Sequence, residues 1–132
     1  MSDRLVYLDS SAFVKLVLPE AETGALVAYL RRWSVAVSAT LLRTEALQAA
    51  TRHSPELVRA TRLALRDMAF IELGRDLLDQ AGALTPPDLR SLDAIHLAAA
   101  LSLGDDLDEV VTYDVRMVAA ASSCGLLVSS PA

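Results

Sequence analysis

The sequence predicts an α/β fold, in which a parallel β-sheet carries helices on both faces. Short apolar runs of strand length alternate with stretches whose apolar residues recur at helical spacing, and this alternation is typical of parallel sheets. The chain has 132 residues, which is too short for two domains of ordinary size. Of these residues 53% are apolar, which is enough for one buried core. We therefore expect a single domain over residues 1–132.

Each predicted strand is a short apolar segment bounded by polar or turn-forming residues. The five strands are expected at 5–8, 35–39, 69–73, 109–113 and 126–128. An aspartate follows the first strand (Asp9) and another follows the fourth (Asp114).

Helical stretches separate these strands. They are expected at 12–18, 22–33, from 41 onward, 56–68, 74–82, 92–103 and 116–123, with a loop at 84–88. We expect Ser10, Thr40 and Ser91 to act as N-caps, and Pro19 and Gly104 to end their helices.

The composition excludes several classes of protein. A single cysteine, Cys124, cannot form an internal disulfide or a thiolate metal cluster, which argues against a secreted, disulfide-stapled protein. No signal-peptide pattern and no apolar run near the ~20 residues of a membrane span are found, so we expect cytoplasmic localisation and no membrane partner. The net charge of −5 argues against a non-specific nucleic-acid coat, but not against an enzyme whose acids surround a metal.

Four acids occupy positions where a carboxylate can have a chemical role. In an open parallel sheet, ligands bind beyond the carboxyl ends of the strands, where the strand order reverses. Asp9 and Asp114 follow predicted strands and so lie where this rule points. Glu45 stands among apolar residues of its helix, and Asp93 stands in the first turn of the most apolar helix.

Each acid also has an ordinary structural explanation. Asp93 in a first turn favours the helix dipole by about 0.3–1 kcal/mol. The two strand-end aspartates could be acids of strand-to-helix loops, and Glu45 could pair at the surface with Arg43 or Arg52.

If the fold brings these carboxylates together, each pair repels. Two charges about 4 Å apart repel by about 4 kcal/mol at an effective dielectric constant of about 20. The cluster is stable only with raised pKa values or a bound divalent cation. Oxygen ligands favour Mg²⁺ or Mn²⁺, as one or two ions, and no His/Cys set with zinc spacing is present. A carboxylate-held metal indicates phosphodiester hydrolysis.

The residues around the four acids resemble the successive motifs of PIN domains. The motifs are Asp-Ser-Ser-Ala at 9–12, Arg-Thr-Glu at 43–45, Ser-Leu-Asp-Ala-Ile-His-Leu-Ala-Ala-Ala at 91–100 and Val-Thr-Tyr-Asp at 111–114. The stretch 119–131 is similar to the end of such domains, so the match runs from residue 9 to the C-terminus. In length and completeness the chain most resembles the VapC toxins of bacterial toxin–antitoxin pairs.

The resemblance implies a three-layer α/β/α fold with a five-stranded parallel sheet in strand order 3-2-1-4-5, which sets Asp9 beside Asp114. It implies that Asp9, Glu45, Asp93 and Asp114 are catalytic and coordinate Mg²⁺ or Mn²⁺ for endoribonucleolytic cleavage. It further implies a toxin of a type II toxin–antitoxin pair that cuts particular RNAs and stops translation. The expected partners are the RNA substrate, a cognate VapB-type antitoxin and a second copy of the chain in a homodimer.

Several nearby residues have two interpretations. Some PIN domains carry a further acid two residues after the fourth, but here that position is Arg116, so a second metal is expected to be held less firmly. Arg116 either contacts an RNA phosphate or is solvated. Ser11 and Thr112 either orient a water at the metal or make ordinary capping bonds. His96, three residues after Asp93, either moves a proton or is a hydrogen-bonded core histidine.

The basic residues are interpreted mainly as surface. Lys15 either reaches the substrate backbone or is a surface charge. A stripe of Arg59, Arg62 and Arg66 could follow RNA phosphates, but is interpreted as a solvated face. The acidic run at 104–109 precedes the fourth strand and is expected at the edge of the sheet opposite the site.

Other functions are weighed against the nuclease. A phosphatase using Asp9 as nucleophile is disfavoured, because Ser11 stands where a second aspartate is expected and no lysine follows Lys15. A receiver domain lacks its aspartate after the third strand, and a dinucleotide-binding fold lacks Gly-x-Gly-x-x-Gly. A catalytically silent PIN-like module that binds metal or a partner stays open.

Overall fold

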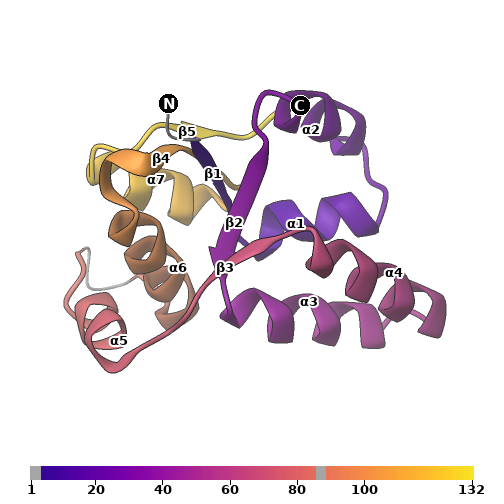
Figure 1. Cartoon of the computed structure of the whole chain (residues 1–132), viewed down its shortest axis with the longest axis horizontal. Helices are drawn as coiled ribbons and strands as arrows, with labels where there is room; N and C mark the ends of the chain where they lie inside the picture. Colours follow the sequence, from indigo (N-terminus) through magenta and orange to yellow (C-terminus); the bar gives the residue numbers. More distant parts are fainter. Residues whose placement is uncertain (1–3, 86–88) are drawn as a thin grey trace.

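A five-stranded parallel sheet with strand order β3-β2-β1-β4-β5 lies at the centre of this computed structural model (Figure 1). The structure describes residues 4–85 and 89–132. The strands are β1 Leu5–Leu8, β2 Val35–Ala39, β3 Ala69–Ile71, β4 Leu107–Val111 and β5 Val128–Ser129. The predicted α/β fold and its strand order are confirmed, and β1 and β4 are neighbours.

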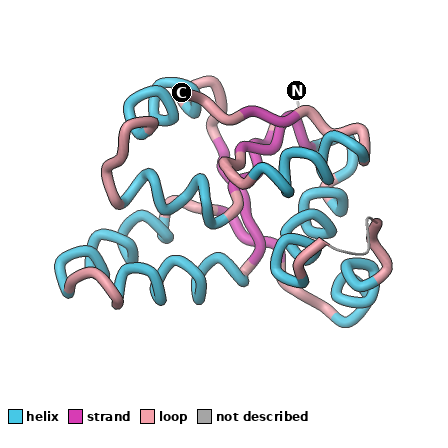
Figure 2. Tube along the Cα trace, turned by 180° about the vertical axis from the view of Figure 1, so that it is seen from behind, coloured by secondary structure: helices cyan, strands magenta, loops and turns pink. Residues whose placement is uncertain are grey.

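Helices cover both faces of the sheet and complete three layers (Figures 1 and 2). Helices α1 to α4 lie on one side and α5 to α7 on the other. In the described residues the helices are α1 Ser10–Val17, α2 Thr23–Leu30, α3 Leu41–Thr51, α4 Pro55–Arg66, α5 Arg75–Gly82, α6 Ser91–Ser102, α7 Val115–Ser123 and the short 3₁₀ helix Gly104–Asp106. None of these described helices is long and apolar enough to cross a membrane.

Strand β1 is the centre of the core because its side chains alternate between the two faces of the sheet. Val6 and Leu8 pack with Leu26 of α2 on one face. Tyr7 packs with Ala99 of α6 on the other face. Fully burying a leucine contributes about 1.5–3 kcal/mol, so these contacts hold the end of β1 in a fixed place.

Strand β4 begins and ends two residues earlier than predicted, over Leu107–Val111 rather than 109–113. Leu107 already pairs with β1, and an extra residue, Asp108, shifts the register before pairing resumes. The Thr112 N–H still donates to the carbonyl of Ser129 at 3.2 Å, whereas the Tyr113 N–H donates to the hydroxyl of Ser11 at the start of α1.

Strand β5 begins two residues later than predicted, at Val128 rather than 126. The Leu126 N–H donates to the carbonyl of Ala121 at 3.1 Å and so closes the end of α7. Gly125 permits this closure with φ +82°, a conformation that other residues rarely adopt.

The remaining boundaries differ by a few residues. Strand β3 ends at Ile71 rather than 73, and α2 ends at Leu30 rather than 33. Of the predicted loop 84–88, residues 84–85 are in neither helix nor strand, and 86–88 lie outside the described residues.

None of the three predicted hydroxyl caps is used. Asp9, not Ser10, caps α1 through its carboxylate. Thr40 stands at the N-cap position of α3, but its backbone is already helical, so its hydroxyl makes no capping bond. Ser91 is the first residue of α6, and Arg90 precedes it without a side-chain cap.

Candidate functional site

Asp9 lies directly after β1, is 3% exposed, and has its carboxylate fixed by three donors. Ser11 Oγ donates to Oδ1 at 2.6 Å, and the Ala12 N–H donates to the same oxygen at 3.1 Å. Thr112 Oγ1 donates to Oδ2 at 2.5 Å. Burial raises the pKa of Asp9 above its usual value, although the three donors act in the opposite direction.

Asp114 follows β4, the neighbour of β1, and caps α7. Its Oδ1 accepts the N–H of Arg116 at 2.9 Å. Thr112 joins the two strand ends, because its hydroxyl donates to Asp9 and accepts the N–H of Asp114 at 3.1 Å. Ser11 and Thr112 therefore use their hydroxyls to hold Asp9 and the β4–α7 turn, as the capping interpretation expected.

Asp93 enters the same site from the first turn of α6. It is half-buried, and its carboxylate makes no hydrogen bond within the described parts of the chain. Burial raises the pKa of Asp93 above its usual value, and the negative charges of Asp114 and Asp9 raise it further. The fold thus brings three aspartates, at positions 9, 93 and 114, close enough for the charges of Asp9 and Asp114 to act on Asp93. In the sequence they are 21 to 105 residues apart.

Glu45 reaches this edge from α3 but is bound to a different partner. His96 Nε2 lies 2.7 Å from Glu45 Oε1, and Ser10 Oγ donates to Oε2 at 3.3 Å. The alternative explanation, a surface pair with Arg43 or Arg52, is wrong, because the Glu45 side chain is 16% exposed and pairs with a histidine that is 2% exposed.

His96 is a hydrogen-bonded core histidine, one of its two predicted interpretations. Its Nδ1 lies 2.7 Å from the hydroxyl of Tyr7, and that hydroxyl accepts the N–H of Ala39 at 3.1 Å. Sequence reasoning missed Tyr7, which is fully buried two residues before Asp9. A polar aromatic residue in the middle of an otherwise aliphatic strand was the available signal, since a buried tyrosine hydroxyl needs a partner.

The donor set at the three aspartates fits a hard divalent cation. Asp93 has both carboxylate oxygens free of hydrogen bonds within residues 4–85 and 89–132, and Asp9 and Asp114 keep unused lone pairs on Oδ2. Burial is the main cause of the raised pKa of Asp93, and the repulsion from Asp114 and Asp9, which adds to it, is what a cation would relieve. Within the described chain, no three His, Cys, Asp or Glu side chains are yet close enough to hold a metal ion.

A groove of about 460 Å³ lies between α1, α3 and the start of α6. Its lining is mixed in charge and polarity, and comprises Ser10, Ser11, Val14, Glu20, Glu45, Gln48, Ala49, Arg52 and Leu92. The acids Glu20 and Glu45 line it together with one base, Arg52, which is exposed.

Lys15 is neither free at the surface nor directed into the groove. Its ammonium binds Glu20 Oε2 at 3.0 Å and Glu22 Oε2 at 3.1 Å, and lies 4.8 Å from the centre of the Tyr113 ring. The side chain is only 12% exposed. Lys15 thus ties the loop between α1 and α2 to the turn that precedes Asp114, a structural role that sequence reasoning did not anticipate.

The other charged residues lie as expected. The stripe of Arg59, Arg62 and Arg66 is exposed along α4, and Arg116 is exposed at the start of α7. The acidic run 104–109 lies at the beginning of β4, where Asp108 pairs with Arg4 at 3.0 Å, so it is at the opposite edge from the three aspartates.

A comparison with protein-family models identifies a PIN domain over residues 6–122. Among characterised proteins, the chain is 44% identical over 126 residues to "Ribonuclease VapC46" of Mycobacterium tuberculosis, covering 96% of this chain and 97% of that protein. It is 37% identical over 134 residues to "Ribonuclease VapC35" of the same organism, again covering 96% and 97%.

Solved structures share the fold at lower identity. The M. tuberculosis toxin VapC20, described as cleaving the sarcin–ricin loop, superposes with a TM-score of 0.71 at 16% identity, covering 92% of this chain and 96% of that one. A toxin–antitoxin complex from Klebsiella pneumoniae gives a TM-score of 0.71 at 21% identity, covering 96% and 98%.

Proposed function

The chain belongs to the PIN-domain family and is a homologue of the VapC ribonuclease toxins, and on this basis we propose that it is a metal-dependent endoribonuclease that cleaves specific cellular RNA. The observation that carries the proposal is the position of Asp9 and Asp114 after the adjacent strands β1 and β4, with Asp93 facing them from the first turn of α6. Burial raises the pKa of Asp93, and the negative charges of Asp114 and Asp9 raise it further. A carboxylate cluster with uncompensated charge suits a divalent cation and phosphodiester chemistry.

In this proposal the three aspartates hold Mg²⁺ or Mn²⁺, as one or two ions, with Glu45 as the fourth acid of the site. A cation bound there supplies Lewis-acid polarisation of the phosphate and lowers the pKa of water. Asp9 is the fixed member, because Ser11, Ala12 and Thr112 set the orientation of its carboxylate.

The groove supports RNA as the substrate. Its lining includes Ser10 and Ser11, which directly follow Asp9 in the chain, together with Gln48 and the exposed Arg52 of the α3 side. Hydroxyl, amide and guanidinium groups are those that commonly contact phosphate oxygens and position a nucleic-acid strand. We infer that an RNA strand lies along α3 with its scissile phosphate at the aspartates.

The family also suggests the biological setting. The relatives are ribonucleases of the VapC type, and one structural neighbour is a toxin–antitoxin complex. We infer that this chain is the toxin of a type II pair, that it stops translation by cutting RNA, and that a VapB-type antitoxin silences it. The formation of a homodimer stays a prediction.

The alternatives have weaker support. A phosphatase needs Asp9 as an accessible nucleophile, but Asp9 is 3% exposed and both of its oxygens accept hydrogen bonds. A silent binding module has no specific observation in its favour, since the four acids are present and three of them interact electrostatically.

The purified, antitoxin-free protein should cut total cellular RNA into discrete fragments in Mg²⁺ or Mn²⁺. An excess of EDTA should abolish the new ends, and adding back Mn²⁺ should restore the same ends. Sequencing of the 5′ ends measures both results and identifies the target RNA. Cleavage that persists in EDTA, or RNA left intact across the whole cellular pool, would contradict the proposal.

A further inference from the structure

We propose that His96, held by the hydroxyl of Tyr7, is a positioning residue that fixes the carboxylate of Glu45 toward the metal site. The inference rests on the proposed function and adds two residues, His96 and Tyr7, that act through Glu45 rather than on the substrate.

The contact between His96 and Glu45 is short and shielded from water. Nε2 and Oε1 are 2.7 Å apart, His96 is 2% exposed, and the Glu45 side chain is 16% exposed. A charge-assisted hydrogen bond in such surroundings is stronger than one at the surface. It selects one orientation for a side chain whose rotatable bonds would otherwise allow many.

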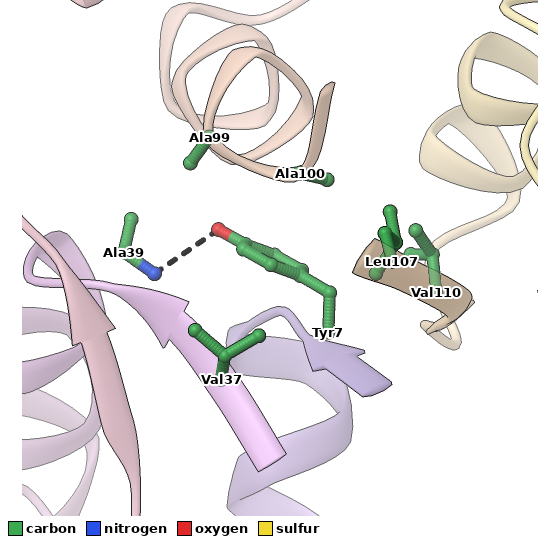
Figure 3. Close-up of a cluster of buried hydrophobic side chains, with 7 residues drawn as sticks. All are labelled: Tyr7, Val37, Ala39, Ala99, Ala100, Leu107 and Val110. Carbon is green, nitrogen blue, oxygen red and sulfur yellow. Dashed lines mark hydrogen bonds between the residues drawn. The ribbon is translucent and has the colours of Figure 1, made fainter. Parts of the chain in front are cut away.

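Tyr7 determines which nitrogen of His96 carries the proton. The hydroxyl of Tyr7 accepts the N–H of Ala39 at 3.1 Å, and Figure 3 shows this bond with the ring enclosed by the sheet and α6. The hydroxyl proton is then available for His96 Nδ1, 2.7 Å away. A phenol is an ordinary donor at neutral pH, so the accepted bond from Ala39 leaves its proton for Nδ1.

Because Nδ1 accepts from Tyr7, the ring proton of a neutral His96 stands on Nε2, where it faces Glu45 Oε1. The hydrogen bonds therefore run in one direction, from the Ala39 N–H through the Tyr7 hydroxyl to His96, and from His96 to Glu45. Oε1 is held by His96 at 2.7 Å, and Oε2 accepts the longer bond from Ser10 at 3.3 Å and keeps a lone pair for the metal site.

His96 and Tyr7 thus hold Glu45, the proposed metal ligand, without contacting the metal themselves. Partners that hold a ligating side chain are commonly as important as the ligand itself, and their loss lowers metal affinity or activity by about 10- to 100-fold. The packing around Tyr7 makes the support rigid, since Val37, Ala99 and Val110 enclose its ring.

The test compares Mn²⁺ affinity and cleavage kinetics for three variants. His96→Leu removes the donor to Glu45 and should weaken Mn²⁺ binding by about 10- to 100-fold. His96→Gln offers an amide N–H near the position of Nε2 and should recover most of that loss. His53→Gln, at an exposed histidine in the turn after α3, is the matched control and should bind Mn²⁺ as the wild type does.

A double-mutant cycle separates positioning from general damage to the fold. In a Glu45→Gln background, His96→Leu should cause no further loss of Mn²⁺ affinity, because its effect passes through Glu45. Equal losses in both backgrounds would overturn the inference. Nitrogen-15 NMR of the histidine rings should show the proton of His96 on Nε2 in the wild type, and a proton on Nδ1 would also overturn it.

Asp93→Asn, measured in the same Mn²⁺ titration, distinguishes failure of the positioning role of His96 from failure of the proposed metal site. If Asp93→Asn weakens Mn²⁺ binding and His96→Leu does not, the positioning role is wrong and the metal site stands. If Asp93→Asn leaves Mn²⁺ binding unchanged, the proposed metal site itself is wrong, and the positioning role falls with it.

Discussion

Asp9→Asn is expected to lower kcat for RNA cleavage by about 100- to 1,000-fold, because a cation at such a site is worth several kcal/mol in the transition state and each 1.4 kcal/mol is a factor of ten. Asp9 is the acid whose orientation is most strongly fixed, by Ser11, Ala12 and Thr112. An amide in its place keeps a cap for α1 but loses the charge that holds the cation.

The fold should survive this substitution. Asparagine is as good an N-cap as aspartate, and burial already disfavours the charged carboxylate, as the raised pKa of Asp9 indicates. Steady-state kinetics on the mapped RNA target, with thermal unfolding of the same preparations, measure both effects. Asp67→Asn, at an exposed position after α4, is the control and should leave kcat unchanged. Cleavage by Asp9→Asn at the wild-type rate would remove Asp9 from the active site.

The metal-free protein is expected to gain stability from the site as the pH falls below neutrality. The folded-state pKa values of Asp9 and Asp93 are raised by burial and, for Asp93, by the charges of Asp114 and Asp9. Between the unfolded and folded pKa values, the folded protein therefore binds more protons than the unfolded chain, so lowering the pH favours folding. Asp108 and Glu22 have lowered pKa values and act in the opposite direction.

Asp93→Asn isolates the contribution of the site from those opposing groups. In EDTA at pH 7.5 it should raise the free energy of unfolding by about 1 kcal/mol, or the melting temperature by roughly 4 °C, where most substitutions lower both. The gain should shrink as the pH is lowered and Asp93 of the wild type takes up its proton. Added Mn²⁺ should stabilise the wild type and not the variant. Denaturant titrations across this pH range measure the difference, and a less stable Asp93→Asn at pH 7.5 would contradict it.

Much of the fold is readable from local sequence. Strands β1 and β2 have the predicted bounds because each is an apolar run closed by a polar residue, at Asp9 and Thr40. The bounds of β4 and β5 are shifted because strand pairing sets them, through the extra residue at Asp108 and the closure of α7 at Leu126. Such pairing depends on the partner strand, which no local pattern reports.

Some residues of the candidate site could likewise be predicted from the sequence, and others could not. Asp9 and Asp114 could be located from the sequence, since each follows a predicted strand, and the resemblance to PIN domains supplied the strand order that makes those strands neighbours. The partner of Glu45 could not, because His96 is 51 residues away in the sequence and the nearer arginines are more obvious partners. The ion pairs of Lys15 with Glu20 and Glu22 could not be predicted either, since they depend on the conformation of the loop after α1.

The position of a bound Mn²⁺ ion tests the central claim most directly. Crystals of the wild-type protein grown with Mn²⁺ should show an anomalous peak coordinated by carboxylate oxygens of Asp9, Asp93 and Asp114, at about 2.0–2.2 Å from each ligating atom. The same experiment on Asp93→Asn should show a weaker peak or none. A strong Mn²⁺ peak away from all three aspartates, or one unaffected by Asp93→Asn, would contradict the assignment of this edge of the sheet as the active site.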